Sequence, residues 1–143
     1  MIVFGPVPSR RLGQSLGVNN IPPKTCSYSC VYCQIGKTNH MRAKRDTFYK
    51  PQEIFGQVER KLRGLGEERV DYLSFVPDGE PTLDRNLGQH IDLLKPLGIK
   101  IAVITNGSLL WMDDVKKDLL KADWVSVKTD TTDHDIWKKI DRP

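Results

Sequence analysis

The chain alternates between short runs of β-branched residues and longer amphipathic stretches, and this alternation restricts its possible folds most strongly. Residues 50–64, with Pro51 near the start and apolar residues at helical spacing, are typical of a helix. The complete pattern predicts helices over 50–64, 84–94 and 112–121, and strands over 15–20, 70–76, 99–104 and 124–128. Because strands separated by helices are joined by right-handed crossovers, we expect an α/β fold with a parallel sheet of βα units and about four strands.

Polar turns follow the predicted strands. The first strand precedes three cysteines, the second runs into residues 77–81 (PDGEP), and the third ends in residues 105–107 (TNG). The carboxyl ends of parallel strands meet at one edge of a sheet, where functional side chains gather. We therefore expect the chemistry of the chain at that edge.

The composition predicts one soluble domain. The 143 residues are 38% hydrophobic and 28% charged, which is typical of a globular domain that needs no disulfide bonds to fold. No apolar run approaches the roughly 18–20 residues of a transmembrane helix, and residues 1–11 do not have the pattern of a signal peptide. These observations predict a cytoplasmic protein without a membrane association.

Positive charge is concentrated in residues 1–50, which contain eight basic residues and one acid, Asp46. The remaining 93 residues are slightly acidic, so the net charge of the whole chain is only +4. A basic segment attracts anionic partners, although it can equally be a solvated surface. Arg10 and Arg11 are the first candidates for phosphate contacts.

The three cysteines of the chain, Cys26, Cys30 and Cys33, lie within eight residues in the pattern C-x3-C-x2-C. An odd, clustered set excludes a disulfide framework and indicates a metal in a reducing compartment. Three thiolates can hold three irons of a [4Fe-4S] cluster and leave the fourth iron open for a reactant. The alternative is a zinc site of Cys26, Cys30, Cys33 and His40 in a nucleic-acid-binding module.

The segment CSYSCVYC, followed by a GEP loop and a TNG turn, resembles the radical S-adenosylmethionine (radical SAM) superfamily. This resemblance implies that Cys26, Cys30 and Cys33 bind a [4Fe-4S] cluster whose open iron chelates S-adenosylmethionine. It further implies an enzyme that cleaves S-adenosylmethionine reductively to a 5′-deoxyadenosyl radical, which abstracts hydrogen from a substrate. The cofactor supplies this chemistry.

The resemblance also assigns residues to the S-adenosylmethionine site. Tyr32 occupies the position of an aromatic ring that packs near the adenine. Gly79, Glu80 and Pro81 resemble the GGEP motif of the family, in which Glu80 and neighbouring carbonyls would accept hydrogen bonds from the ammonium group. Asn106, in the TNG turn, would lie near the nucleoside.

The last predicted strand offers three further candidates. Ser126, Lys128 and Asp130 alternate along it and therefore share one face. Lys128 would meet the methionine carboxylate, and Asp130 would meet the ribose hydroxyls. A salt-bridged strand end without a ligand is the competing interpretation.

The length departs from the family pattern. The family core has six βα units in a partial TIM-type barrel, whereas this chain supplies about four strands. We therefore expect a partial, incomplete barrel in which residues 1–143 form a single radical SAM core domain, truncated at its C-terminus. An inactive fragment of such an enzyme is the corresponding alternative.

The opening residues FGPVPSRRLGQSLGVNN resemble a subgroup of the superfamily that includes tRNA wyosine-base synthase and cofactor-maturation proteins. The family context implies an acidic flavodoxin or ferredoxin as the electron donor. The substrate is left open between tRNA, a small molecule and a protein. The basic segment suits a tRNA backbone, the electron donor or only the anionic cofactor.

Overall fold

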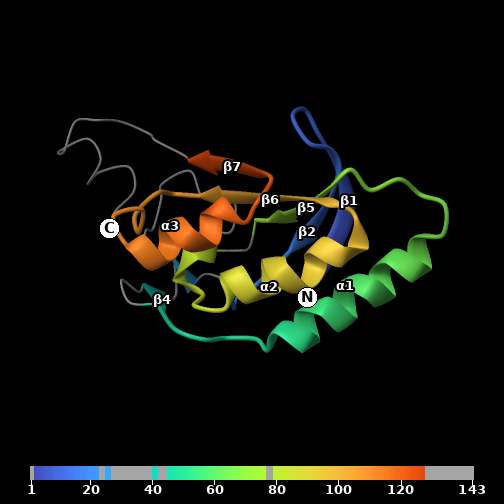
Figure 1. Ribbon diagram of the computed structural model, residues 1–143. Helices are drawn as coiled ribbons and strands as arrows, with labels where there is room; N and C mark the ends of the chain where they lie inside the picture. The colour runs from blue at the N-terminus through green and yellow to red at the C-terminus, as the bar shows by residue number, and fades with distance from the viewer. Residues whose placement is uncertain (1, 23–24, 27–39, 42–44, 77–78, 128–143) are drawn as a thin grey trace.

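The computed structural model describes residues 2–22, 25–26, 40–41, 45–76 and 79–127, which form a twisted five-stranded sheet with helices beside it and a separate two-stranded sheet (Figure 1). The sheet has the order β1-β2-β5-β6-β7. Its strands are β1 (Val3–Ser9), β2 (Gly13–Val18), β5 (Tyr72–Phe75), β6 (Lys100–Thr105) and β7 (Trp124–Val127). The last four run parallel to one another, and β1 is antiparallel to β2.

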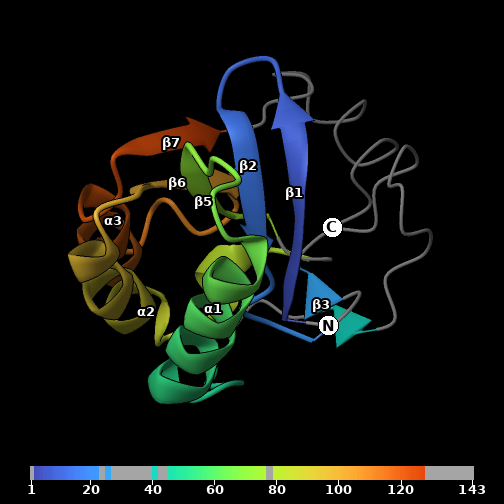
Figure 2. The ribbon, with the colours of Figure 1, turned by 90° about the vertical axis from the view of Figure 1, so that its right-hand side faces the viewer.

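The helices α1 (Pro51–Leu65), α2 (Leu87–Leu94) and α3 (Asp113–Leu120) lie on one face of the sheet (Figure 2). Two short 3-10 helices, η1 (Pro81–Leu83) and η2 (Lys95–Leu97), flank α2. Helices on a single face of a mostly parallel, unclosed sheet form part of a TIM-type barrel. The predicted fold class, an incomplete barrel with four parallel strands, is therefore confirmed.

The core lies between the sheet and the helices. Side chains alternate between the two faces of each strand, and the parallel register aligns the inward-facing ones in rows across three strands. These rows are Leu16–Leu73–Ile101 and Val18–Phe75–Val103, all fully buried. The helices cover them with Ile54, Val58, Leu87, Ile91, Leu94, Val115 and Leu119. Burial of this apolar surface is the main force that holds the βα units together.

Two local predictions were wrong. No strand was predicted before residue 15, but β1 contains Pro6 and Pro8 and forms the edge of the sheet. A proline lacks the N–H that a central strand needs, whereas an edge strand tolerates it. The cysteine segment was expected to be entirely loop, yet Cys26 ends β3 (Thr25–Cys26), which pairs with β4 (His40–Met41).

The parallel register places the carboxyl ends of β2, β5, β6 and β7 at one edge of the sheet. The segments that follow these ends contain the cysteines, the GEP loop and the TNG turn. Within the described residues, no helix is both long enough and apolar enough to cross a membrane.

Candidate functional site

The carboxylate of Glu80 joins the GEP loop to the turn after β6. Its Oε1 accepts a hydrogen bond from the Asn106 amide at 2.7 Å, and its Oε2 accepts one from Thr105 Oγ1 at 2.6 Å. Oε2 also accepts from the backbone N–H of Thr82 at 3.0 Å and from the hydroxyl of Thr82. The side chain of Glu80 thereby connects the GEP loop to the turn after β6, which lies 25 residues further along the chain.

Glu80 is almost completely buried, with 1% of its surface exposed. Burial disfavours a charged carboxylate and raises the pKa of Glu80 above its ordinary value, while the hydrogen bonds from Thr105, Thr82 and Asn106 oppose the increase. The direction of the shift shows that desolvation outweighs these four donors. A carboxyl group in this position is sensitive to any change in its hydrogen-bond partners.

The TNG turn is shaped by its own side chains. Asn106 Oδ1 accepts from the Ser108 amide at 2.9 Å, and Thr105 Oγ1 accepts from the Gly107 amide at 3.1 Å. Gly107 has a φ of 77°, and a Cβ atom there would lie 2.9 Å from a methyl group of Val127. Glycine is therefore required at this position for both backbone conformation and space.

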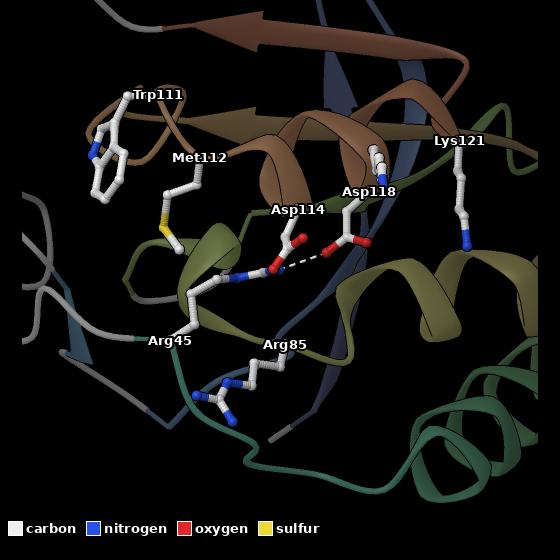
Figure 3. Close-up of a pocket in the computed structure, with 8 residues that line it drawn as sticks. Arg45, Arg85, Trp111, Met112, Asp114, Asp118 and Lys121 are labelled. Carbon is white, nitrogen blue, oxygen red and sulfur yellow. Dashed lines mark hydrogen bonds and ion pairs between the residues drawn. The ribbon is translucent and has the colours of Figure 1, made fainter.

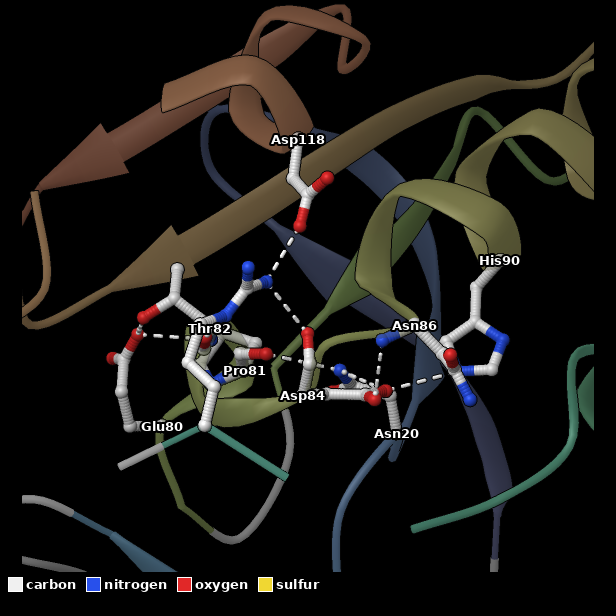
Figure 4. A network of polar contacts seen from close by, with 9 residues as sticks. Asn20, Glu80, Pro81, Thr82, Asp84, Asn86, His90 and Asp118 are labelled. Atoms are coloured by element: carbon white, nitrogen blue, oxygen red, sulfur yellow. Dashed lines mark hydrogen bonds and ion pairs between the residues drawn. The ribbon is translucent and has the colours of Figure 1, made fainter. Parts of the chain in front are cut away.

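A buried polar network surrounds the turn at residues 80–85, which follows β5 (Figure 4). Asp84 Oδ2 accepts from Asn20 Nδ2 at 3.1 Å and from His90 Nε2 at 2.9 Å, and Asp84 Oδ1 accepts from the Asn86 amide at 2.8 Å. Asn20 Nδ2 also donates to the Pro81 carbonyl at 3.1 Å. Asn20, Asp84 and His90 are fully buried, so these bonds are shielded from water.

Arg45 reaches the other side of the same turn. Its Nε donates to the Thr82 carbonyl at 2.8 Å, and one terminal nitrogen donates to the Asp84 carbonyl at 2.8 Å. That nitrogen also forms an ion pair with Asp118 of α3 at 2.5 Å. The planar guanidinium therefore holds three acceptors from two elements, which suits its fixed fork of donors.

A groove of about 640 Å³ lies next to Arg45, on the side of α3 (Figure 3). Both members of the Arg45–Asp118 ion pair line it, as does the exposed ring of Trp111. Its complete lining in the described part of the chain is Arg45, Arg85, Trp111, Met112, Asp114, Lys117, Asp118 and Lys121. Glu80 and Asn106 are not among these described lining residues.

The structure brings some of the predicted site residues together. Glu80 and Asn106 are joined by a hydrogen bond, and Pro81 begins η1 directly after Glu80. Gly79 precedes Glu80, and Ser126 lies in β7 beside Ile104 of β6. That these residues contact S-adenosylmethionine stays a prediction.

The other predicted residues lie outside the described residues in whole or in part. Cys26 is described only by its backbone in β3, and the same holds for His40 in β4. The structure does not describe Cys30, Cys33, Tyr32, Lys128 and Asp130. Their assignments also stay predictions.

The donor set of the cysteine segment fits a [4Fe-4S] cluster. Three cysteines offer three thiolates, the ligand type that binds iron in such clusters, and the spacing keeps them within eight residues. The backbone of Cys26 lies in the segment that follows the carboxyl end of β2, at the edge where Glu80 and Asn106 lie. The backbone of Cys26, the first predicted cluster ligand, and the buried carboxylate thus come from the same edge of the sheet.

Sequence reasoning missed Asn20, Arg45, Asp84 and His90. None of them belongs to a motif, and their contacts join residues 37–73 positions apart, except for the local contacts of Asp84 with Asn86 and His90. The local signal that could have found the pair is the carboxylate that precedes α2 and the histidine six positions later. No comparable local sequence pattern indicates the contacts of Asn20 and Arg45.

Comparison with known proteins identifies a family. The family model described as the radical SAM superfamily matches residues 20–143. A UPF0026 protein of Methanocaldococcus jannaschii is 54% identical over 142 residues, which are 99% of this chain and 44% of that protein. A probable GTP 3′,8-cyclase of Pyrococcus horikoshii is 29% identical over 117 residues, which are 82% of this chain and 35% of that protein.

A solved structure shares the fold. TYW1, determined with a lysine–pyruvate adduct bound, superposes with a TM-score of 0.66 at 17% identity and covers 90% of this chain and 46% of its own. This neighbour shows the shared fold, the relation to the wyosine-synthase subgroup stays a prediction, and nothing in the comparisons supports the zinc-binding module. The chain spans less than half of the length of each of these three proteins.

Proposed function

The chain belongs to the radical SAM superfamily, and from this membership we propose that it is the core of an enzyme that cleaves S-adenosylmethionine reductively. Members of the superfamily are enzymes that bind a [4Fe-4S] cluster and S-adenosylmethionine. The observation that carries the proposal is the C-x3-C-x2-C motif inside the matched residues 20–143. When bound, the cluster supplies the electron and S-adenosylmethionine supplies the radical.

In this proposal Cys26, Cys30 and Cys33 hold the cluster through their thiolates. Glu80 fixes the GEP loop against the TNG turn, so that backbone carbonyls of the loop and the second lone pair of Oε1 are held ready to accept from the ammonium group. Its buried hydrogen bonds support this positioning role. Asn106, whose side chain shapes the turn, orients the nucleoside.

Further roles are proposed for residues near the carboxyl ends of the strands. Tyr32 packs against the adenine, Lys128 binds the methionine carboxylate, Asp130 binds the ribose hydroxyls, and Ser126 belongs to the same cofactor site. A flavodoxin or ferredoxin supplies the electron from outside, and the substrate is a tRNA, a small molecule or a protein. Residues 1–143 form one core domain, and the clustered thiols suit a cytoplasmic, reducing location.

The test is anaerobic reconstitution with iron and sulfide. We expect about four irons per chain, an EPR signal of the reduced cluster that changes when S-adenosylmethionine is added, and release of 5′-deoxyadenosine. Cys30→Ala removes a thiolate and should abolish the cluster signal.

His40→Ala is the matched control. It leaves the three thiolates intact, so iron content and the EPR signal should equal those of the wild type. A colourless protein that binds zinc, and loses it when His40 is replaced, would contradict the proposal. So would a cluster signal that S-adenosylmethionine does not change.

A further inference from the structure

The three cysteines lie in sequence between two buried residues that bond to the same turn. Asn20 comes six residues before Cys26, and Arg45 comes twelve residues after Cys33. Both side chains donate hydrogen bonds to the turn at residues 80–85. The two ends of the cysteine-bearing segment are therefore attached to one place in the fold.

The first attachment is a single amide group. Asn20 Nδ2 donates to the Pro81 carbonyl and to Asp84 Oδ2, both at 3.1 Å. Two bonds from one nitrogen to one turn fix the chain just after the carboxyl end of β2, before the cysteines begin. Because Asn20 is fully buried, water cannot replace these bonds without opening the structure.

The second attachment combines side chain and backbone. Arg45 donates to the carbonyls of Thr82 and Asp84, each at 2.8 Å. The next residue continues the contact: the Asp46 amide donates to the Leu83 carbonyl at 2.9 Å, and the Arg85 amide donates to the Asp46 carbonyl at 2.9 Å. Residues 45–46 thus pair with the turn as a short parallel bridge.

The same turn carries Glu80. Thr82, whose carbonyl accepts from Arg45, also donates through its amide and hydroxyl to the Glu80 carboxylate. Glu80 in turn binds the Thr105 hydroxyl and the Asn106 amide. One turn therefore connects both ends of the cysteine segment with the GEP loop and the TNG turn. Figure 4 shows Asn20 beside the part of this turn that carries Glu80, Thr82 and Asp84.

We propose that Asn20 and Arg45 are positioning residues that fix the cysteine-bearing segment against the Glu80 turn and so set the cluster in register with the S-adenosylmethionine site. This inference rests on the proposed function, since it concerns the relative placement of that function's two parts. Neither residue needs to touch the cluster or S-adenosylmethionine. Their effect is transmitted by the carbonyls of Pro81, Thr82 and Asp84.

The test compares two positioning variants with two controls. Arg45→Lys keeps a cation near Asp118 but cannot reproduce the planar fork, and Asn20→Leu removes the amide at similar volume. Asp118→Asn changes the ion pair of Arg45 and leaves both carbonyl bonds in place. Lys121→Gln removes the exposed ion pair with Asp92 and does not touch the turn.

The first readout needs no cofactor. Hydrogen exchange of the Asp46 and Arg85 amides reports the bridge directly, and we expect it to be about tenfold faster or more in Arg45→Lys. Amides of α1 serve as the internal reference, because that helix does not contact the turn through these bonds. Unchanged exchange at both amides would overturn the role of Arg45.

The second readout separates positioning from cluster assembly. After reconstitution we expect near-wild-type iron content in Arg45→Lys and Asn20→Leu, because all three thiols remain. S-adenosylmethionine should bind about tenfold more weakly or worse, with a reduced change in the EPR signal. Lys121→Gln should stay within about twofold of the wild type, because its ion pair with Asp92 is exposed. Asp118→Asn should do the same, because the asparagine oxygen can still accept from Arg45.

The affinities of the variants decide whether Asn20 and Arg45 are positioning residues. Affinities within about twofold of the wild type in both positioning variants, or equal losses in the controls, would overturn the proposal. If Asn20→Leu does not fold, the milder Asn20→Ser gives the same comparison. If the wild type itself binds no iron, the proposed function fails and this role fails with it. If the wild type binds the cluster, losses of affinity that are confined to the positioning variants test the positioning role alone.

Discussion

Two carboxylates at opposite edges of the sheet have pKa values that are shifted in opposite directions. Burial raises the pKa of Glu80 at the carboxyl edge. At the amino edge, a hydrogen bond from the Gln14 amide at 2.9 Å, aided by Arg69, lowers the pKa of Asp71. The first group favours the protonated form on folding and the second favours the ionised form. Their contributions to stability must therefore depend on pH with opposite signs.

The first prediction concerns Glu80→Gln. The glutamine nitrogen cannot accept a hydrogen bond, so either the Thr82 or the Asn106 amide loses its acceptor. We expect this loss to lower the unfolding free energy by about 1–3 kcal/mol near pH 4.5. The ordinary pKa of a glutamate is 4.5, and because the pKa of Glu80 is raised, Glu80 stays protonated to a higher pH in the folded wild type than in the unfolded chain. Wild-type stability therefore falls as the pH rises through the raised pKa, and the difference from the variant narrows.

Urea unfolding of both proteins from pH 4.5 to pH 7 measures that difference. Because all other titrating groups are shared, subtraction isolates Glu80. A difference that grows toward neutral pH would show that hydrogen bonding, not burial, dominates this carboxyl group.

The second prediction concerns Asp71→Asn. The lowered pKa means that the wild-type carboxylate contributes stability above its ordinary value of 3.8, and that this contribution disappears as the pH falls through the lowered value. The urea midpoints of wild type and variant should therefore differ most at neutral pH and converge in acid. Because Asp71 lies at the amino edge, binding of S-adenosylmethionine should be unchanged. A midpoint difference that persists in acid would refute the assignment to charge.

At the scale of elements, periodicity predicted the parallel strands and the helices, with boundaries displaced by up to three residues. A strand such as β6 is recognisable as a short apolar, β-branched run, because Ile101, Ala102 and Val103 are all buried in sequence. β1 could not be predicted, because Pro6 and Pro8 are unfavourable in most strands and are tolerated only at this edge. β1 forms because it pairs with β2, and the local sequence of β1 does not reveal this pairing.

The third prediction tests the β1–β2 hairpin. Gly17 of β2 lies opposite Phe4 of β1, and a Cβ atom at Gly17 would overlap the Phe4 ring. Gly17→Ala should therefore displace the ring and lower the unfolding free energy by about 1–3 kcal/mol. Gly56→Ala is the matched control: it lies inside α1 with open space around it and should stabilise by about 0.5–1 kcal/mol. Thermal unfolding of both variants checks this, and equal effects would contradict the close contact.

At the scale of the whole molecule, the sequence predicted which segments meet at one edge of the sheet but not what holds that edge together. The loops containing Cys26, Glu80 and Asn106 could be assigned to one edge because parallel strands impose it. The contacts of Asn20 and Arg45 with the turn at residues 80–85 depend on the folded register, and no local spacing encodes them. Motifs locate the chemistry, whereas buried polar contacts between distant segments determine its geometry.

The fold also changes the interpretation of the basic residues near the N-terminus. Arg10 and Arg11 lie in the turn between β1 and β2, which immediately precedes Gly13 at the amino end of β2. The carboxyl edge is one strand away, and a six-residue strand spans about 20 Å. That separation is about two and a half times the Debye length of roughly 8 Å at physiological ionic strength. These two arginines should therefore not contribute to cofactor binding.

The last prediction follows from this separation. Replacing Arg10 and Arg11 together by glutamine should change the affinity of the reconstituted protein for S-adenosylmethionine by less than about twofold at 0.15 M salt, because the charges are screened across the strand. Titration calorimetry measures it, with Arg45→Lys as the variant that does weaken binding. If the double variant loses affinity as strongly as Arg45→Lys, the cofactor is not confined to the carboxyl edge. If its affinity is unchanged while binding of an anionic macromolecule weakens, the basic turn serves a partner at the opposite end of the sheet.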